Sequence, residues 1–272
     1  MNINSSIGIF DSGLGGLSVL KQFIRFLPYE SYVYLGDTAR VPYGNKSVET
    51  VGRYAEECTE FLIKKDVKLI VVACNTVSSN ALENVTRVAK DIPVIGMIRP
   101  GSLAAYRTSQ SKRIGIIGTR ATINSKSYEI ELKNLADNQD INIYSKACPL
   151  FVPLVEEGML NNDATKQIAH FYLDEFKSKN IDTLILACTH YPLLANVFKE
   201  ILPNVNLIDS GEHSSVSALR LLAERKLLKE EKNIFIERPD IKFFVTDLPQ
   251  NFHIQARSFL GFDVDSPELI DL

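Results

Sequence analysis

Short, almost wholly apolar runs alternate with longer amphipathic stretches along this chain of 272 residues. Between two such runs, residues 47–64 repeat apolar side chains at helical spacing, at Val51, Ala55, Cys58 and Leu62. Alternation of apolar strands with helices is typical of a parallel sheet that helices cover on both faces. The predicted class is therefore α/β, in a doubly wound arrangement. The strands are expected at 7–10, 32–35, 69–73, 93–97, 114–117, 141–144, 183–187, 205–208 and 241–245.

The charge balance excludes several classes of partner. With 30 basic and 33 acidic side chains the net charge is −3, so the basic excess typical of nucleic-acid binding is absent and we expect no nucleic-acid partner. No run approaches the roughly 18 consecutive apolar residues of a membrane span, and residues 1–6 lack the features of a signal peptide. Four Cys are too few for a disulfide scaffold. We therefore expect a cytoplasmic protein with reduced thiols and no membrane partner.

The chain contains a weak internal repeat. Residues 7–12 (IGIFDS) resemble residues 114–119 (IGIIGT), and residues 70–76 (IVVACNT) resemble residues 184–190 (LILACTH), in the same order and at similar offsets. Any two buried strands followed by polar turns share such features, which is the simpler interpretation. Both copies of the second motif, however, place a Cys at the same register. We therefore predict two related halves.

Cys74 and Cys188 each follow the end of an apolar strand, where open α/β sheets place their chemistry. A single Cys in such a place is more often a small buried apolar residue. A matched pair is compatible with a redox couple, two metal ligands, or an acid and a base. The chain has no Cys-x-x-Cys motif, which removes the usual zinc and thioredoxin-type spacings. An acid–base pair remains.

Two thiols on opposite faces of a carbon atom suit a racemase that needs no cofactor. One thiolate removes the α-proton, and the opposite thiol protonates the other face of the carbanion. Because a free Cys with a pKa of about 8.5 is mostly protonated at neutral pH, each thiol needs a neighbour that favours its reactive form. Asp11 and His190 are the candidates, since His190 lies two positions from Cys188. A structural role is the alternative for an isolated His.

Two polar loops follow the first strands. Residues 10–16 form a Gly-rich turn whose backbone amides suit an anion. They are not a Walker A motif, because no Gly-Lys-Ser/Thr follows, and they miss Gly-x-Gly-x-x-Gly, because Ser18 stands at the third glycine position. Asp11 and Ser12 therefore fit a small molecule better than a nucleotide. Residues 36–44 form the second loop, whose amides suit a carboxylate unless the loop is only a structural turn.

At these residues the chain resembles the glutamate racemase family, within the aspartate/glutamate racemase superfamily. The segments that carry the resemblance are Asp11-Ser12-Gly13, Tyr34 to Gly44, Ala73-Cys74-Asn75-Thr76 and Cys188-Thr189-His190-Tyr191-Pro192-Leu193. Further matches are Gly118-Thr119-x-x-Thr122, Pro153 to Gly158, Asp209-Ser210-Gly211 and Thr246-Asp247. The resemblance runs from residue 7 to about residue 261, which is nearly the whole chain.

The resemblance implies interconversion of L- and D-glutamate without pyridoxal phosphate or metal, supplying D-glutamate for peptidoglycan. It implies that Cys74 deprotonates the D-enantiomer and Cys188 the L-enantiomer. The positions that match the family's substrate contacts are Asp11, Ser12, Tyr43, Gly44, Asn75, Thr76, Thr189 and His190. Further active-site positions are matched by Thr119, Thr122 and Glu157.

The resemblance also implies two pseudo-symmetric α/β domains with the active site in the cleft between them. Residues 1–97 plus 208–272 are expected to form the first domain and residues 98–207 the second. A homodimer is expected as well. The chain departs from the family's pattern at Arg99, Val77 and Ala187, where Glu, Ala and Gly are expected.

Two other functions stay open at this point. The chain could be a related two-Cys racemase or isomerase for aspartate or another small acid. It could also be a binding protein that kept the scaffold without turnover, although both Cys are present. The remaining thiols, Cys58 and Cys148, are expected to be packing residues.

Overall fold

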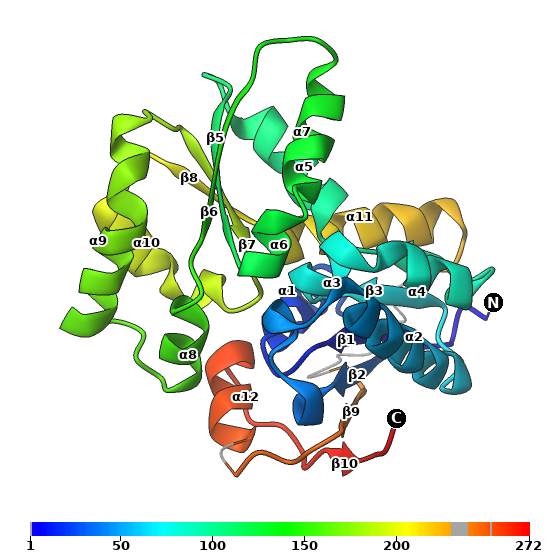
Figure 1. The fold of residues 1–272 in the computed structure, drawn as a ribbon. Coiled ribbons are helices and arrows are strands. Elements are labelled where there is room, and N and C mark those ends of the chain that lie inside the picture. Colours follow the sequence, from blue (N-terminus) through cyan, green and yellow to red (C-terminus); the bar gives the residue numbers. More distant parts are fainter. Residues whose placement is uncertain (1, 230–238, 251) are drawn as a thin grey trace.

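The computed structural model describes residues 2–229, 239–250 and 252–272, and it contains two parallel sheets with helices around them (Figure 1). The first sheet has the strand order β10-β9-β2-β1-β3-β4, and every pairing in it is parallel. Its strands are β1 (Ile7–Asp11), β2 (Tyr32–Gly36), β3 (Leu69–Val72), β4 (Val94–Ile95), β9 (Ile241–Val245) and β10 (Glu268–Leu269).

The second sheet has the order β6-β5-β7-β8 and is also parallel. Its strands are β5 (Arg113–Gly118), β6 (Asn142–Ala147), β7 (Thr183–Ala187) and β8 (Asn206–Asp209). This order repeats β2-β1-β3-β4 of the first sheet, with β5 in the place of β1 and β7 in the place of β3. Those strands carry the two repeated sequence motifs, so the prediction of two related α/β halves is confirmed.

Twelve α-helices lie in the described part of the chain. They are α1 (Leu17–Phe26), α2 (Val48–Lys64), α3 (Asn75–Asn80), α4 (Leu82–Ala89), α5 (Ile98–Thr108), α6 (Arg120–Asn124), α7 (Ser127–Ala136), α8 (Phe151–Glu156), α9 (Asp163–Ser178), α10 (Ala195–Ile201), α11 (Ser210–Glu224) and α12 (Phe252–Leu260). Three short 3-10 turns join them, at Thr38–Arg40, Tyr43–Asn45 and Tyr191–Leu194. Side-chain caps fix some helix starts: Ser47 accepts from the amide of Thr50 at 3.3 Å at the start of α2.

The core explains why the strands are apolar on both sides. In β1, Ile9 packs toward the cluster that contains α1, α11 and α12, whereas Phe10 packs toward α2 and α4. In β5, Ile116 packs toward α5 and α7, and Ile117 packs toward α9 and α10. Successive side chains of a strand point to opposite faces, so each central strand needs apolar residues at every position. The doubly wound α/β prediction is confirmed.

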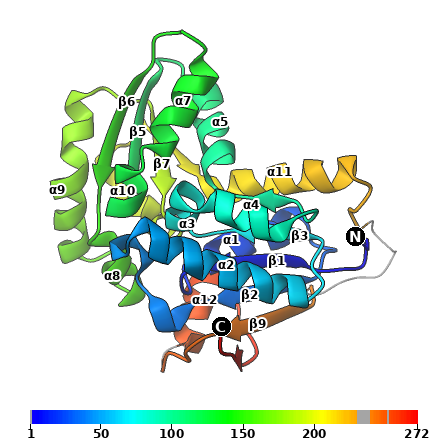
Figure 2. The same ribbon diagram turned by 45° about the vertical axis from the view of Figure 1, so that its right-hand side comes forward.

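Helix α11 joins the two halves. It begins directly after β8 of the second sheet and packs against α1 of the first half and α5 of the second (Figure 2). Because β8 ends at Asp209, that strand crosses the expected domain boundary between residues 207 and 208. The boundaries themselves stay a prediction.

Local details differ from the sequence-based expectations where short elements are involved. Between β3 and β4 the helical segment is divided into α3 and α4 at Ala81, where the backbone leaves the helical region. The strand expected at 93–97 is only two residues long. Among the described residues, no helix has the length and apolar character that crossing a bilayer requires.

Candidate active site

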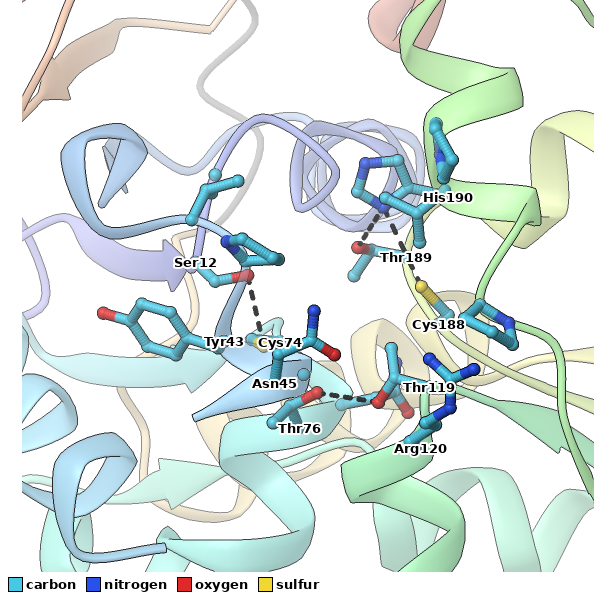
Figure 3. A pocket seen from close by; sticks show the side chains of 18 of the residues that line it. Ser12, Tyr43, Asn45, Cys74, Thr76, Thr119, Arg120, Cys188, Thr189 and His190 are labelled. Atoms are coloured by element: carbon cyan, nitrogen blue, oxygen red, sulfur yellow. Dashed lines mark hydrogen bonds between the residues drawn. The ribbon is translucent and has the colours of Figure 1, made fainter. Parts of the chain in front are cut away.

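A cavity of about 360 Å³ lies between the two sheets, lined by residues that follow the carboxyl ends of β1, β3, β5 and β7 (Figure 3). Parallel strands end at one edge of their sheet, and ligands of open α/β sheets bind at that edge. Here two such edges contribute to one cavity. Its size suits a small molecule with few heavy atoms better than a nucleotide.

The two thiols predicted as acid and base both line this cavity. Cys74 lies two residues past β3 at the start of α3, and Cys188 directly follows β7. Figure 3 shows them on opposite sides of the pocket, Cys74 beside Ser12 and Cys188 beside His190. Each is 6% exposed. A substrate in the cavity therefore meets one thiol from each half of the molecule.

The surroundings of Cys74 favour its protonated form. The thiol donates to the Ser12 hydroxyl at an Sγ–Oγ distance of 3.5 Å. Burial and the nearby Asp11 carboxylate raise the pKa of Cys74 to about 12, although the contact with Ser12 acts in the opposite direction. At neutral pH Cys74 thus presents a proton to the cavity.

Cys188 has a positively charged neighbour instead. Its Sγ lies 3.8 Å from Nδ1 of His190, whose Nε2 lies 3.0 Å from Oε1 of Glu156. Burial lowers the pKa of His190, but the hydrogen bonds to Cys188 and Glu156 outweigh burial and raise that pKa to about 10. The imidazole is therefore protonated at neutral pH, and both ring nitrogens donate. The imidazolium therefore lies beside the Cys188 sulfur. A positive charge there stabilises the thiolate form, which is the form that accepts a proton.

Asp11 lies beneath the cavity and not in its lining. It is 1% exposed, and its Oδ2 accepts from the amide of Gly13 at 3.1 Å. Burial raises its pKa, an effect that the charge on His190 partly offsets. Its Oδ1 has no hydrogen-bond partner among the described residues. Asp11 therefore acts on the cavity through charge and through the turn that it holds.

A cluster of hydroxyl groups connects the two halves at the cavity. Thr76 Oγ1 lies 3.0 Å from Thr119 Oγ1, which lies 3.0 Å from Thr122 Oγ1. Thr119 also caps α6 by accepting from the amide of Thr122. Thr76 and Thr119 line the cavity, and Thr122 is buried behind them. Hydroxyl groups both donate and accept, so this cluster suits the polar groups of a small acid.

The loop after β2 closes one side of the cavity. Tyr43 and Gly44 line it, and the Tyr43 hydroxyl donates to the buried carboxylate of Asp37. Asp37 also accepts from Arg40 at 2.6 Å and from the Thr246 hydroxyl at 2.8 Å. The buried Asp37 carboxylate therefore fixes the conformation of the loop from outside the cavity lining.

Ten of the thirteen sequence-predicted site residues line this cavity: Ser12, Tyr43, Gly44, Cys74, Asn75, Thr76, Thr119, Cys188, Thr189 and His190. Asp11 and Thr122 lie directly behind the lining. Glu157 is exposed after the end of α8 and lies outside it, whereas its neighbour Glu156 lines the cavity and contacts His190. The remaining thiols, Cys58 and Cys148, do not line the cavity and are buried in the apolar clusters that also contain Cys74 and Cys188, respectively.

Sequence reasoning missed several lining residues: Gly13, Val41, Pro42, Asn45, Arg120, Pro149, Val152, Pro153 and Glu156. For α8 a signal was available. Val152 and Glu156 are four positions apart and thus share one face of a helix, whereas Glu157 points about a quarter-turn away. Arg120 follows β5 by two positions, at an edge where other polar residues were predicted. Arg120 and His190 carry the positive charge among the described lining residues.

The described residues contain no group of three or more His, Cys, Asp and Glu side chains arranged to hold a metal ion. What they do contain is a pair of thiols at equivalent strand ends of two related α/β halves, which defines the class of two-domain racemase folds. A comparison with family models agrees, since residues 7–214 match the model described as Asp/Glu/Hydantoin racemase. The chain belongs to this racemase family, whose members are isomerases.

Individual relatives cover nearly the whole chain. It is 46% identical over 270 residues to a glutamate racemase of Chlorobaculum tepidum, covering 99% of this chain and 97% of the relative. A crystal structure of the Francisella tularensis glutamate racemase in complex with D-glutamate matches with a TM-score of 0.91 and 40% identity, covering 99% and 98% of the two chains. A Thermus thermophilus glutamate racemase in complex with β-chloro-D-alanine matches with a TM-score of 0.88 and 40% identity, covering 100% and 99%.

Proposed function

We propose that this protein interconverts L- and D-glutamate by proton transfer at Cα between two cysteines, without an organic cofactor or metal. The observation that carries the proposal is the pair Cys74 and Cys188, which line one cavity from two different sheets. The relatives named glutamate racemase, one of them in complex with D-glutamate, support glutamate as the substrate.

In the proposed direction from L- to D-glutamate, the Cys188 thiolate removes the Cα proton. The bonding electrons stay on the substrate as a carbanion that is delocalised into the α-carboxylate. The Cys74 thiol then gives its proton to the opposite face of Cα, so that Cys188 ends as a thiol and Cys74 as a thiolate. The reverse reaction exchanges these roles. Because each enantiomer meets a different base, inversion needs both thiols.

The protonation states in the cavity support this assignment. Protonated His190, held by Glu156, faces Cys188 and stabilises negative charge on its sulfur. Cys74, whose pKa is about 12, carries the proton that the product requires. We propose that Ser12, Asn75, Thr76 and Thr189 bind the polar groups of glutamate, and that Arg120 adds positive charge for a substrate with two carboxylates.

The test is exchange with solvent deuterium. Purified protein in D₂O, given L- or D-glutamate and no added cofactor, is expected to incorporate deuterium at Cα and to form the other enantiomer. Each of Cys74→Ala and Cys188→Ala is expected to lower the racemisation rate by about 10³-fold or more, because one of the two proton transfers then lacks its group. Chiral chromatography and NMR give the two readouts.

Cys58→Ala is the matched control, because Cys58 is a buried thiol outside the cavity lining and this variant is expected to stay active. An equal loss in a folded Cys58→Ala protein would contradict the assignment of the thiols. Parallel assays with aspartate separate the proposed activity from that of a racemase for another small acid. Glutamate that binds without exchange would instead indicate a binding protein.

Further proposals rest on the same identification. We propose that the product D-glutamate serves peptidoglycan synthesis in the cytoplasm and that the protein forms a homodimer. We also propose the division into residues 1–97 plus 208–272 and residues 98–207, with the active site between the two parts.

A further inference from the structure

Tyr128 lies outside the cavity lining but contacts a residue inside it. It is the second residue of α7 in the second half, and it is 2% exposed. Its hydroxyl donates to Oδ1 of Asn75 at 2.7 Å, and Asn75 directly follows Cys74 in the first half. A buried hydroxyl thus crosses from one half of the molecule to the residue beside a proposed catalytic thiol.

The same hydroxyl contacts both places where the chain passes between the two sheets. Its oxygen lies 2.8 Å from Oγ of Ser210, the first residue of α11, and 3.5 Å from the carbonyl of Met97, which precedes α5. Burial raises the pKa of the Tyr128 hydroxyl, so the hydroxyl keeps its proton at neutral pH and can donate a hydrogen bond. With its single proton given to Asn75, it accepts from Ser210.

The packing around this hydroxyl is close. A Cβ atom at Gly101 of α5 would lie 2.6 Å from Oγ of Ser210 and 3.3 Å from Cε1 of Tyr128. A second bond fastens α7 to α3, since the Ser127 hydroxyl donates to the carbonyl of Ser79 at 2.7 Å. The tyrosine ring therefore has little freedom to move away from Asn75.

The contact has a consequence for the cavity. Asn75 lines it, and its Nδ2 has no acceptor among the described residues. With Oδ1 held by Tyr128, the NH₂ end of the carboxamide is the end left for a ligand. A reversed amide would instead turn a carbonyl oxygen toward an anionic substrate, which repels it.

We propose that Tyr128 is a positioning residue: its hydroxyl holds the Asn75 carboxamide so that NH₂ donates to a carboxylate of the substrate. This rests on the proposed function, and it adds a residue from the opposite half that acts on substrate through Asn75. The hydrogen bond from Ser210 fixes the Tyr128 hydroxyl at the start of α11, where the chain crosses between the two sheets, so the orientation of the amide depends on how the two halves are placed.

Steady-state kinetics of Tyr128→Phe test the proposal, because this variant removes only the oxygen atom. The KM for both enantiomers is expected to rise about tenfold, the usual cost of a lost buried hydrogen bond to substrate binding, while kcat changes less than about threefold. Tyr106→Phe is the matched control: its hydroxyl donates to Gln139 at 2.9 Å in an exposed contact of the same half. That variant is expected to keep the wild-type KM.

A double-mutant cycle shows whether Tyr128 acts through Asn75. In an Asn75→Ala background, Tyr128→Phe is expected to change KM by less than about twofold, because the group that it positions is gone. Losses that multiply in the double variant would overturn the proposal, and so would a wild-type KM in Tyr128→Phe. Should Tyr128→Phe fail to fold, Ser210→Ala decides. A KM about threefold higher supports the proposal and an unchanged KM overturns it.

The outcome for the wild type separates the two proposals. A wild-type protein that neither racemises nor binds glutamate removes the proposed function and this inference together. An active wild type with an unaltered Tyr128→Phe variant removes only the inference.

Discussion

His190 makes two contacts that oppose the effect of its burial. The imidazole is buried, which by itself disfavours the charged form, yet its contacts with Cys188 and Glu156 keep it protonated. Cys74 across the cavity has the opposite surroundings, because burial and Asp11 keep it a thiol. Two side chains of the same type therefore have different charged neighbours, and these neighbours suit the opposite roles proposed for the two thiols.

Glu156→Gln tests this difference. Without the carboxylate the pKa of His190 falls from about 10, so the imidazole loses its charge at lower pH. The alkaline limb of the L-to-D rate is expected to shift to lower pH by about one unit, whereas the acidic limb stays in place. The pH profile of kcat/KM measures the shift.

Glu157→Gln is the matched control, since Glu157 is exposed and lies outside the cavity lining. Its profile is expected to coincide with that of the wild type. If the two variants behave alike, or if only Glu157→Gln shifts the limb, His190 does not depend on Glu156. The comparison also decides which of the two adjacent carboxylates belongs to the site.

At the scale of elements, the turn before α1 contacts the turn after β7. A Cβ atom at Gly15 would lie 2.4 Å from both Cε1 of His190 and Oγ1 of Thr189. The ring of His190 has little room to yield, because Glu156 and the ring of Phe259 at 5.5 Å also contact it. The absence of a side chain at position 15 thus lets the two halves approach at the active site.

Gly15→Ala is expected to lower kcat/KM by about 100-fold, because a displacement of His190 of an ångström is enough to misplace the thiol that it faces. Gly158→Ala is the matched control, which is expected to change stability and not activity. Gly158 has φ +70° and no atom within 4 Å of an added Cβ, so it should lose about 1 kcal/mol of stability and keep its activity. Thermal melts and initial rates separate the two effects, and an active Gly15→Ala protein would show that the turn can yield.

The sequence predicted the central elements because their signals are local. β1, β3, β5 and β7 are apolar at nearly every position, and the polar residues that follow them in the chain also follow them in space. Glu156 was missed because only the register of α8 distinguishes it from Glu157. No local pattern predicts the contact of Tyr128 with Asn75 and Ser210, since it joins three distant segments.

At the scale of the whole molecule, the chain must return to the first sheet after leaving it at β4. A buried ion pair lies where it returns. Lys68 Nζ lies 2.6 Å from Oε2 of Glu30, with 0% and 1% of the two side chains exposed. The ammonium also donates to the carbonyls of Ile3 and Leu227, at 2.7 and 2.8 Å, and Glu30 accepts from the amide of Lys229 at 3.0 Å. One charge pair therefore fastens the beginning of the chain, the start of β3 and the segment after α11.

Lys68→Met is expected to lower the free energy of unfolding by about 3–5 kcal/mol, because it removes the ammonium that pairs with the buried Glu30 carboxylate. For a chain of this length the melting temperature should fall by about 8–15 °C. Arg87→Met is the control, since Arg87 pairs with Glu56 at the surface, where removal costs less than about 1 kcal/mol.

Adding Glu30→Leu to Lys68→Met should recover part of the loss, because an apolar pair needs no charge compensation. If the double variant is no more stable than Lys68→Met, the lost carbonyl contacts hold the returning segment and the ion pair does not.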